Sequence, residues 1–151
     1  MPYFEDNSLC THIRNQDGEL FSVGWLSHER SYPQGECPPP FLDRLFALCL
    51  SPVNLTRGHH VCDLCLADGD REYRLADGQI IRTTQLIIQR DGVDLWLGNG
   101  EIHVRDRRGR GYAAPTMVYH YVEKHRYRPP DGFIEAINLS EKHSQGEMCL
   151  P

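Results

Sequence analysis

The chain has 151 residues, which is enough for one domain with a modest core and too few for two independent catalytic domains. Hydrophobic residues make up 40% of it and charged residues 25%, a balance that is typical of globular proteins and excludes collagen-like, coiled-coil and wholly disordered chains. The formal net charge of −5 argues against broad binding to phosphate backbones, since a basic surface supplies most of the affinity in such complexes.

The first elements predicted along the chain are a strand and a helix. Residues 20–26 follow a turn signal and alternate in polarity, which predicts a strand that buries Trp25. A loop with three consecutive prolines follows. After it, the apolar side chains of residues 41–50 recur at helical spacing, and Pro52 prevents the helix from continuing.

Short strands separated by turn dipeptides are predicted next. Asp77-Gly78 and Asp91-Gly92 are typical of tight hairpin turns. The strands predicted around these turns and after them are residues 73–75, 79–82, 85–89, 93–97 and 101–105. Their alternating polarity predicts one buried face, and an antiparallel meander is the simplest topology.

The last part of the chain predicts helices. Residues 114–125 change the hydrophobic period from two to 3.6, with Pro115 in the first turn, and residues 131–137 predict a short closing helix. We therefore expect a single α+β domain over residues 1–137, in which an antiparallel meander carries two main helices on one face. Residues 138–151 are expected to form a polar tail.

The N-terminal residues and the cysteines bear on the cellular compartment. The chain begins without the basic start and the apolar stretch of about 7–15 residues of a secretory signal. Its longest apolar run, residues 46–50, is far shorter than the roughly 20 residues of a membrane-spanning helix. We expect a cytoplasmic protein, in which a close pair among the six cysteines indicates a metal site rather than a disulfide.

The sharpest chemical signal is a pair of cysteines at C-x₂-C spacing. Cys62 and Cys65 can turn two thiolates toward one ion, and His60 lies two residues before the first of them. Zinc accepts sulfur and imidazole tetrahedrally and is the ion that this set of ligands predicts. We therefore predict a zinc knuckle built on His60, Cys62 and Cys65.

The fourth ligand of this site has to come from a distant part of the chain. The candidates are His120 and His125 on the later helix, His28 in the loop after the first strand, and Cys37. Positions five apart on a helix point about 140° apart, so at most one of the two helical histidines is expected to reach the ion. His125 lies on the apolar face and fits a core histidine. His120 lies at the edge of that face and is the preferred fourth ligand.

Other interpretations of these residues stay open. Cys62 and Cys65 could form a thiol–disulfide switch or simply pack in the core. An enzyme would keep an open zinc position for water, with Glu101 or Asp63 as the base. The cluster Arg105–Arg110 could bind nucleic acid, although such a hairpin tip is more often a solvated turn and the chain is acidic overall.

Several short sequence blocks are spread along the chain: Val23-Gly24-Trp25-Leu26, Arg57 to Cys65, Leu97-Gly98 with Glu101 to Val104, Tyr112 to Pro115, and His120 to Pro130. Together they resemble the blocks of an uncharacterised family of small bacterial proteins that is common in actinobacteria. In this family the position of His59 is usually occupied by an aromatic residue, and the family's histidine stands at the position of His60. The resemblance therefore assigns the ligand role to His60 and not to His59. It also implies that one later histidine belongs to the same set, and it brings no established activity.

These observations predict a zinc-stapled, non-catalytic domain. A closed site with four protein ligands leaves no position for water or substrate, and it would instead stabilise a small domain with long loops. We expect the domain to bind a protein partner in an immunity-like or regulatory role, and we expect neither nucleic acid nor membrane as its partner.

Overall fold

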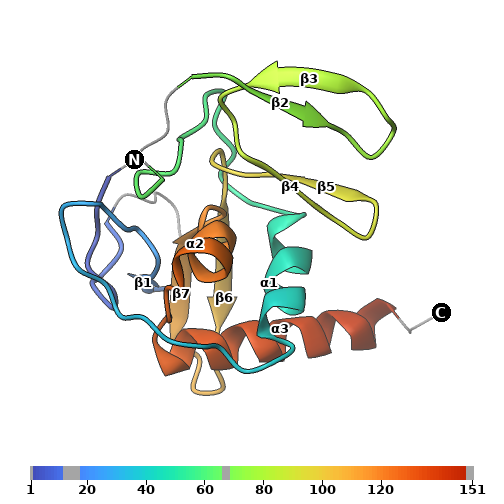
Figure 1. The fold of residues 1–151 in the computed structure, drawn as a ribbon. Coiled ribbons are helices and arrows are strands. Elements are labelled where there is room, and N and C mark those ends of the chain that lie inside the picture. Colours follow the sequence, from blue (N-terminus) through green and yellow to red (C-terminus); the bar gives the residue numbers. More distant parts are fainter. Residues whose placement is uncertain (1, 12–17, 66–68, 149–151) are drawn as a thin grey trace.

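A computed structural model describes residues 2–11, 18–65 and 69–148, the last eight of these by backbone alone. Its central sheet has three strands in the order β1-β7-β6 (Figure 1). β1 (Leu20–Ser22) runs parallel to β7 (Gly111–Pro115), which pairs antiparallel with β6 (Glu101–Arg105). β7 therefore lies in the middle, between the earliest strand of the chain and its own hairpin partner.

Two further hairpins lie beyond this sheet. β2 (Arg71–Arg74) pairs with β3 (Ile80–Thr83), and β4 (Ile87–Arg90) pairs with β5 (Val93–Trp96), both antiparallel. The turns fall at the two predicted Asp-Gly dipeptides, where Gly78 and Gly92 have φ of +88° and +76°. The four hairpin strands and β6 were therefore predicted to within about two residues, a normal margin for element ends.

The predicted meander is wrong, because these hairpins do not join the central sheet. Among the described residues, the three sheets are separate. Side chains rather than a backbone ladder connect the two outer hairpins. The Asp94 carboxylate accepts a hydrogen bond from the backbone N–H of Ala76, with N···O distances of 3.0 and 3.1 Å, and the Gln89 amide donates to the carbonyl of Arg74 at 3.2 Å. Alternation within each hairpin predicted the strands but could not predict which hairpins would pair.

Helices pack against the sheet and against each other. α1 (Phe41–Cys49) is the helix predicted after the prolines, and it contacts both α2 (Val118–His125) and α3 (Asp131–Met148). α3 also lies along β6. Edge-to-face aromatic pairs join these elements, with ring centroids 6.5 Å apart for Phe41 and Phe133 and 5.5 Å apart for Phe46 and Tyr119. The core thus lies where α1, α2 and α3 meet the central sheet.

The second helix begins at Val118 and not at Ala114, as the periodicity had predicted. Residues 111–115 instead form β7, the middle strand of the central sheet, and all five are buried. A strand that is covered on every side needs no polar alternation, so its sequence resembles a buried helix. The expected start of the helix was wrong for this reason.

The closing helix is longer than predicted. α3 continues to Met148, through most of the segment expected to be a polar tail, and residues 149–151 lie outside the described part. Its first turns bury Phe133, Ile134 and Ile137, and this packed start allows the helix to propagate into a polar sequence. Among the described helices, none combines the length and the apolar character needed to cross a membrane.

Candidate metal centre

Two cysteines and two histidines bring their donor atoms together at the surface of α2. Cys62 and Cys65 come from the segment between α1 and β2, and His120 and His125 come from α2. The four donor atoms all lie within 4.8 Å of one another. The Cys65 Sγ is 3.2 Å from the Nε2 of His120 and 3.4 Å from that of His125, and the Cys62 Sγ is 3.4 Å from the Nε2 of His125.

These separations fit a tetrahedral zinc site. Bond lengths of about 2.3 Å to sulfur and about 2.0–2.1 Å to nitrogen place ligand atoms about 3.5 Å apart for a sulfur–nitrogen pair and about 3.8 Å apart for two sulfurs. The observed sulfur–nitrogen distances of 3.2 to 3.4 Å are within a few tenths of an ångström of that value. The residues can therefore hold an ion of this size with only small side-chain movements.

The two helical histidines lie closer together than the helical wheel predicted. Their ring centroids are 5.0 Å apart and the rings are almost perpendicular, at 81°. The expectation that both could not approach one ion is wrong, because the wheel gives the direction of each Cα–Cβ bond and not the reach of an imidazole. His125 is also the last residue of α2, where Arg126 turns the chain into the left-handed region at φ +57°. The Tyr32 hydroxyl donates to the His125 carbonyl at 3.1 Å and holds this last turn in place.

A spacing rule could have identified His125 from the sequence. Zinc sites commonly combine C-x₂₋₄-C with H-x₃₋₅-H, and His120 and His125 are separated by four residues. The sequence analysis gave more weight to the helical wheel than to this spacing, and it therefore assigned His125 to the core.

His28, which was itself a candidate ligand, holds the turn between Cys62 and Cys65 through its contact with Asp63. The Asp63 Oδ2 accepts from the backbone N–H of His28 and lies 2.7 Å from its Nδ1 as well. These hydrogen bonds from His28 lower the pKa of the Asp63 carboxyl, and the same contact raises the pKa of His28. His28 therefore orients the loop between the two thiols, and its Nδ1 is directed at Asp63 rather than at the cluster.

Burial controls protonation at the cluster. It raises the pKa of the Cys62 thiol to about 12 and lowers the pKa of His120 to about 4. Burial also lowers the pKa of His125. At neutral pH the imidazoles thus carry free lone pairs, whereas the Cys62 thiol has to lose a proton to an incoming metal ion. A redox-active cysteine has a lowered pKa instead, so the environment of Cys62 is unfavourable to a thiol–disulfide switch.

The remaining candidates lie elsewhere. His60 donates its backbone N–H to the Gly98 carbonyl at 2.8 Å, and its side chain lines a pocket with Trp25, outside the four-residue cluster. Cys37 is half-buried beside Arg128. The Glu101 carboxylate, considered as a base, lies 3.1 Å from the Nε2 of His103.

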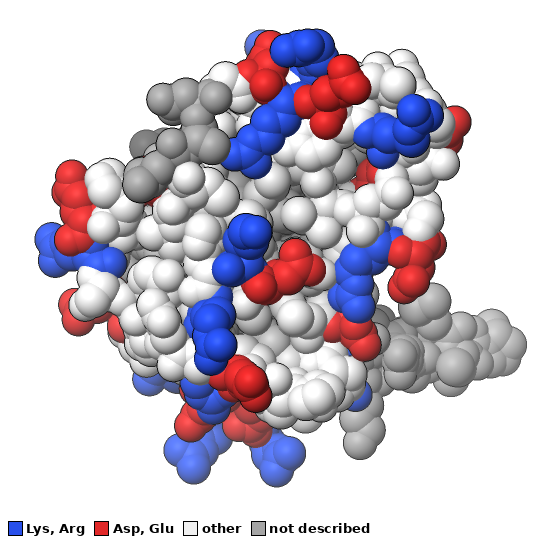
Figure 2. All heavy atoms as spheres, viewed as in Figure 1, with Lys and Arg blue, Asp and Glu red and all other residues white. Residues whose placement is uncertain are grey.

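Contacts within the protein engage several arginines of the Arg105–Arg110 tip. Arg105 donates to the Gly109 carbonyl at 3.0 Å, Arg107 lies 3.5 Å from a Glu135 carboxylate oxygen, and Arg110 stacks on the Phe21 ring. On the face seen in Figure 2, basic and acidic side chains are interspersed without a large patch of one sign.

Comparisons with known proteins locate the chain in one family. Neither the curated proteins nor the solved structures contain a significant match. A family model described as "Domain of unknown function (DUF7919)" matches residues 2–138, which include all four residues of the cluster. The sequence blocks predicted membership of an uncharacterised family, and that expectation is confirmed. The chain therefore belongs to the DUF7919 family of domains of unknown function.

Proposed function

We propose that this domain binds one zinc ion through Cys62, Cys65, His120 and His125, and that the ion serves as a structural staple. The observation that carries this proposal is the convergence of the four donor atoms to within 4.8 Å. Two thiols and two imidazoles form a ligand set that zinc favours over magnesium or calcium, which prefer oxygen.

Four protein ligands support a structural rather than a catalytic role. Zinc enzymes keep one position for water or substrate, and a complete tetrahedral set leaves none. The ion would connect α2 to the segment between α1 and β2, which are distant in sequence. Structural zinc contributes on the order of 10 kcal/mol in zinc-binding peptides, so this connection would be a large part of the stability of a small domain.

We further propose that the domain acts by binding a protein partner, in an immunity-like or regulatory role. Exposed apolar side chains in the segment directly after α1 support this, because such side chains are typical of contact surfaces when they cluster. Leu50 and Val53 are each 43% exposed, and Leu55 is 64% exposed. We place the protein in a reducing compartment such as the bacterial cytoplasm, where both thiols would stay available to the ion.

Metal analysis of the purified protein tests the staple. We expect one zinc per chain, and we expect Cys62→Ser and His125→Ala to lose it. The control is His60→Ala, which should retain the zinc because His60 lies outside the cluster. Cobalt(II) in place of zinc should give the d–d and thiolate charge-transfer bands of a tetrahedral site.

Chelation separates the structural role from the catalytic one. If zinc is a staple, removing it should unfold the chain or lower its melting temperature strongly, as followed by circular dichroism. A protein that retains zinc in His125→Ala, with a water molecule as fourth ligand, would contradict the closed site and favour an enzyme.

A further inference from the structure

Tyr121 carries a buried hydroxyl without a hydrogen-bond partner in the described structure. It lies on α2, directly after His120 and four residues before His125. The residue is fully buried, and its hydroxyl oxygen is out of contact with solvent. Buried polar groups in folded proteins are almost always hydrogen-bonded, so an unpartnered one calls for a physical reason. The position of Tyr121 between two residues of the cluster points to the metal centre as that reason.

The ring of Tyr121 packs beside both histidines of the cluster. Its centroid is 6.5 Å from that of His125 and 6.4 Å from that of His120, with interplanar angles of 56° and 50°. Residues four apart on a helix lie on the same side of it, so Tyr121 and His125 are neighbours on α2. The Nε2 of His125 is in turn 3.4 Å from the sulfurs of Cys62 and Cys65. Tyr121 therefore lies on the buried side of the four ligands.

The charges that act on this hydroxyl come from the cysteine turn. Burial is the main cause that raises the pKa of Tyr121, and repulsion from a Cys62 thiolate is the next. Asp63 and Cys65 follow in that order. Asp63 is the less suitable acceptor, because its side chain is 42% exposed and its Oδ2 is already bound to His28. Cys62 is 8% exposed and belongs to the same hydrophobic cluster as Tyr121, so its sulfur is the acceptor that fits best.

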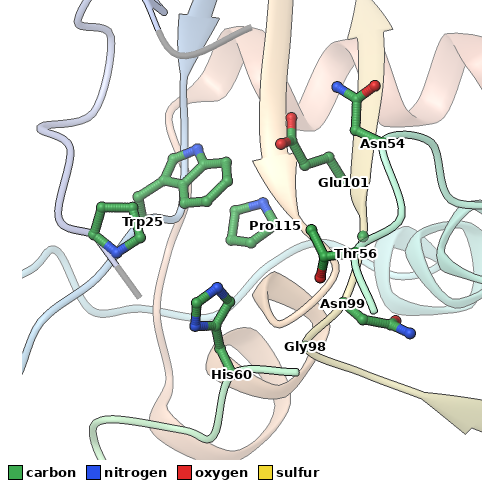
Figure 3. Close-up of a pocket in the computed structure, with 10 residues that line it drawn as sticks. Trp25, Asn54, Thr56, His60, Gly98, Asn99, Glu101 and Pro115 are labelled. Carbon is green, nitrogen blue, oxygen red and sulfur yellow. The ribbon is translucent and has the colours of Figure 1, made fainter. Parts of the chain in front are cut away.

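His60, the polar residue nearest in sequence to Cys62 on its N-terminal side, points elsewhere. Figure 3 shows its ring in a separate pocket beside Trp25. His60 is therefore not placed to donate to the sulfur of Cys62. The donor comes instead from the facing helix α2, which also supplies the two histidines of the cluster.

We propose, on the basis of the zinc site proposed for this domain, that the Tyr121 hydroxyl positions Cys62 by donating a hydrogen bond to its sulfur when that sulfur binds the ion as a thiolate. A thiol is a weak acceptor, whereas a thiolate accepts charge-assisted hydrogen bonds. The hydroxyl therefore gains its partner when the Cys62 proton leaves. Hydrogen bonds to metal ligands fix the orientation of those ligands and adjust their electron donation to the metal.

Cobalt(II) in place of zinc tests this hydrogen bond spectroscopically. A hydrogen bond lowers the energy of the sulfur lone pairs, so Tyr121→Phe should shift the thiolate-to-cobalt charge-transfer band to longer wavelength. The d–d bands should keep their positions, because all four ligands remain. Tyr119→Phe is the matched control. Tyr119 is also buried on α2, but its hydroxyl donates to Glu123 at 3.0 Å, so the control should leave the charge-transfer band unchanged.

Two further measurements examine the same hydrogen bond. In competition with a chelator, Tyr121→Phe should bind zinc about two- to fourfold more weakly than the wild type, as expected for one hydrogen bond of modest net strength. In the wild type loaded with an NMR-active cadmium isotope, the Tyr121 hydroxyl proton should show scalar coupling to the metal through the sulfur. This coupling does not depend on the folding of any variant.

The outcomes separate the role of Tyr121 from the zinc site itself. A wild type without a thiolate-to-cobalt band would contradict both. A wild-type band that does not move in folded Tyr121→Phe, or that moves equally in Tyr119→Phe, would overturn the role of Tyr121 and leave the zinc site standing. If Tyr121→Phe does not fold, the absence of hydroxyl coupling in the cadmium-loaded wild type overturns that role instead.

Discussion

Gly98 occupies a position at which any other residue should destabilise the fold. It has φ +100°, in the region that L side chains rarely adopt, and its carbonyl accepts the backbone N–H of His60 at 2.8 Å. A Cβ at this position would collide with the carbonyl oxygen of His60 and would lie 3.2 Å from its backbone nitrogen. Gly98→Ala therefore forces the backbone of two segments apart, next to the chain that enters Cys62.

The size of this effect can be separated into two parts. The positive φ should cost about 1–3 kcal/mol for alanine. Displacing packed backbone should cost a further 1–3 kcal/mol or so, as in overpacked cores. Gly78→Ala is the matched control, because Gly78 has a similar φ of +88° and a Cβ there would meet nothing within 4 Å. The free energy of unfolding should thus fall by about 1–3 kcal/mol more for Gly98→Ala than for Gly78→Ala.

Urea denaturation followed by circular dichroism measures this difference on metal-loaded protein. A difference of 1 kcal/mol corresponds to a shift of roughly 2–4 °C in melting temperature for a chain of this length. If the two glycine variants lose the same stability, the close approach of Gly98 to His60 is not what requires glycine there, and the reasoning fails.

Three further predictions concern buried polar groups. The Tyr121 hydroxyl is buried without a hydrogen-bond partner in the described structure, so Tyr121→Phe should change the free energy of unfolding by less than about 1 kcal/mol. Tyr127→Phe removes a 2.7 Å hydrogen bond to Asp6 and should lower the free energy of unfolding by about 1–3 kcal/mol, as measured by urea denaturation. Burial raises the pKa of Asp6 above its ordinary value of 3.8, so the contribution of Asp6 to stability is complete below pH 3.8 and is lost as pH rises through the raised pKa. Asp6→Asn should remove this part of the pH dependence of the melting temperature. An unchanged pH profile in Asp6→Asn would contradict this prediction. Zinc binding at pH 7 should release a proton from the Cys62 thiol and none from His120. Isothermal titration calorimetry in buffers of different ionisation enthalpy detects this proton release. Proton uptake on zinc binding would refute the assigned protonation states.

Local signals predicted much of the secondary structure. Three prolines followed by a helical period located α1, and Asp-Gly turns located both outer hairpins. β7 was missed because its residues are buried on all sides and its sequence lacks alternation. Strand pairing between distant segments, such as β1 beside β7, leaves no mark in a short window of sequence.

The candidate site shows the same division. Residue types and short spacing alone indicated that the cysteine pair belongs to a candidate metal site, because a C-x₂-C turn brings two thiols together locally. The choice of His120 and His125 over His60 depended on the packing of α2 against the Cys62–Cys65 turn and on the direction of the backbone at His60. Ligands that are close in sequence are determined by the chain itself, whereas ligands some 55 residues away are determined by which faces the folded core brings together.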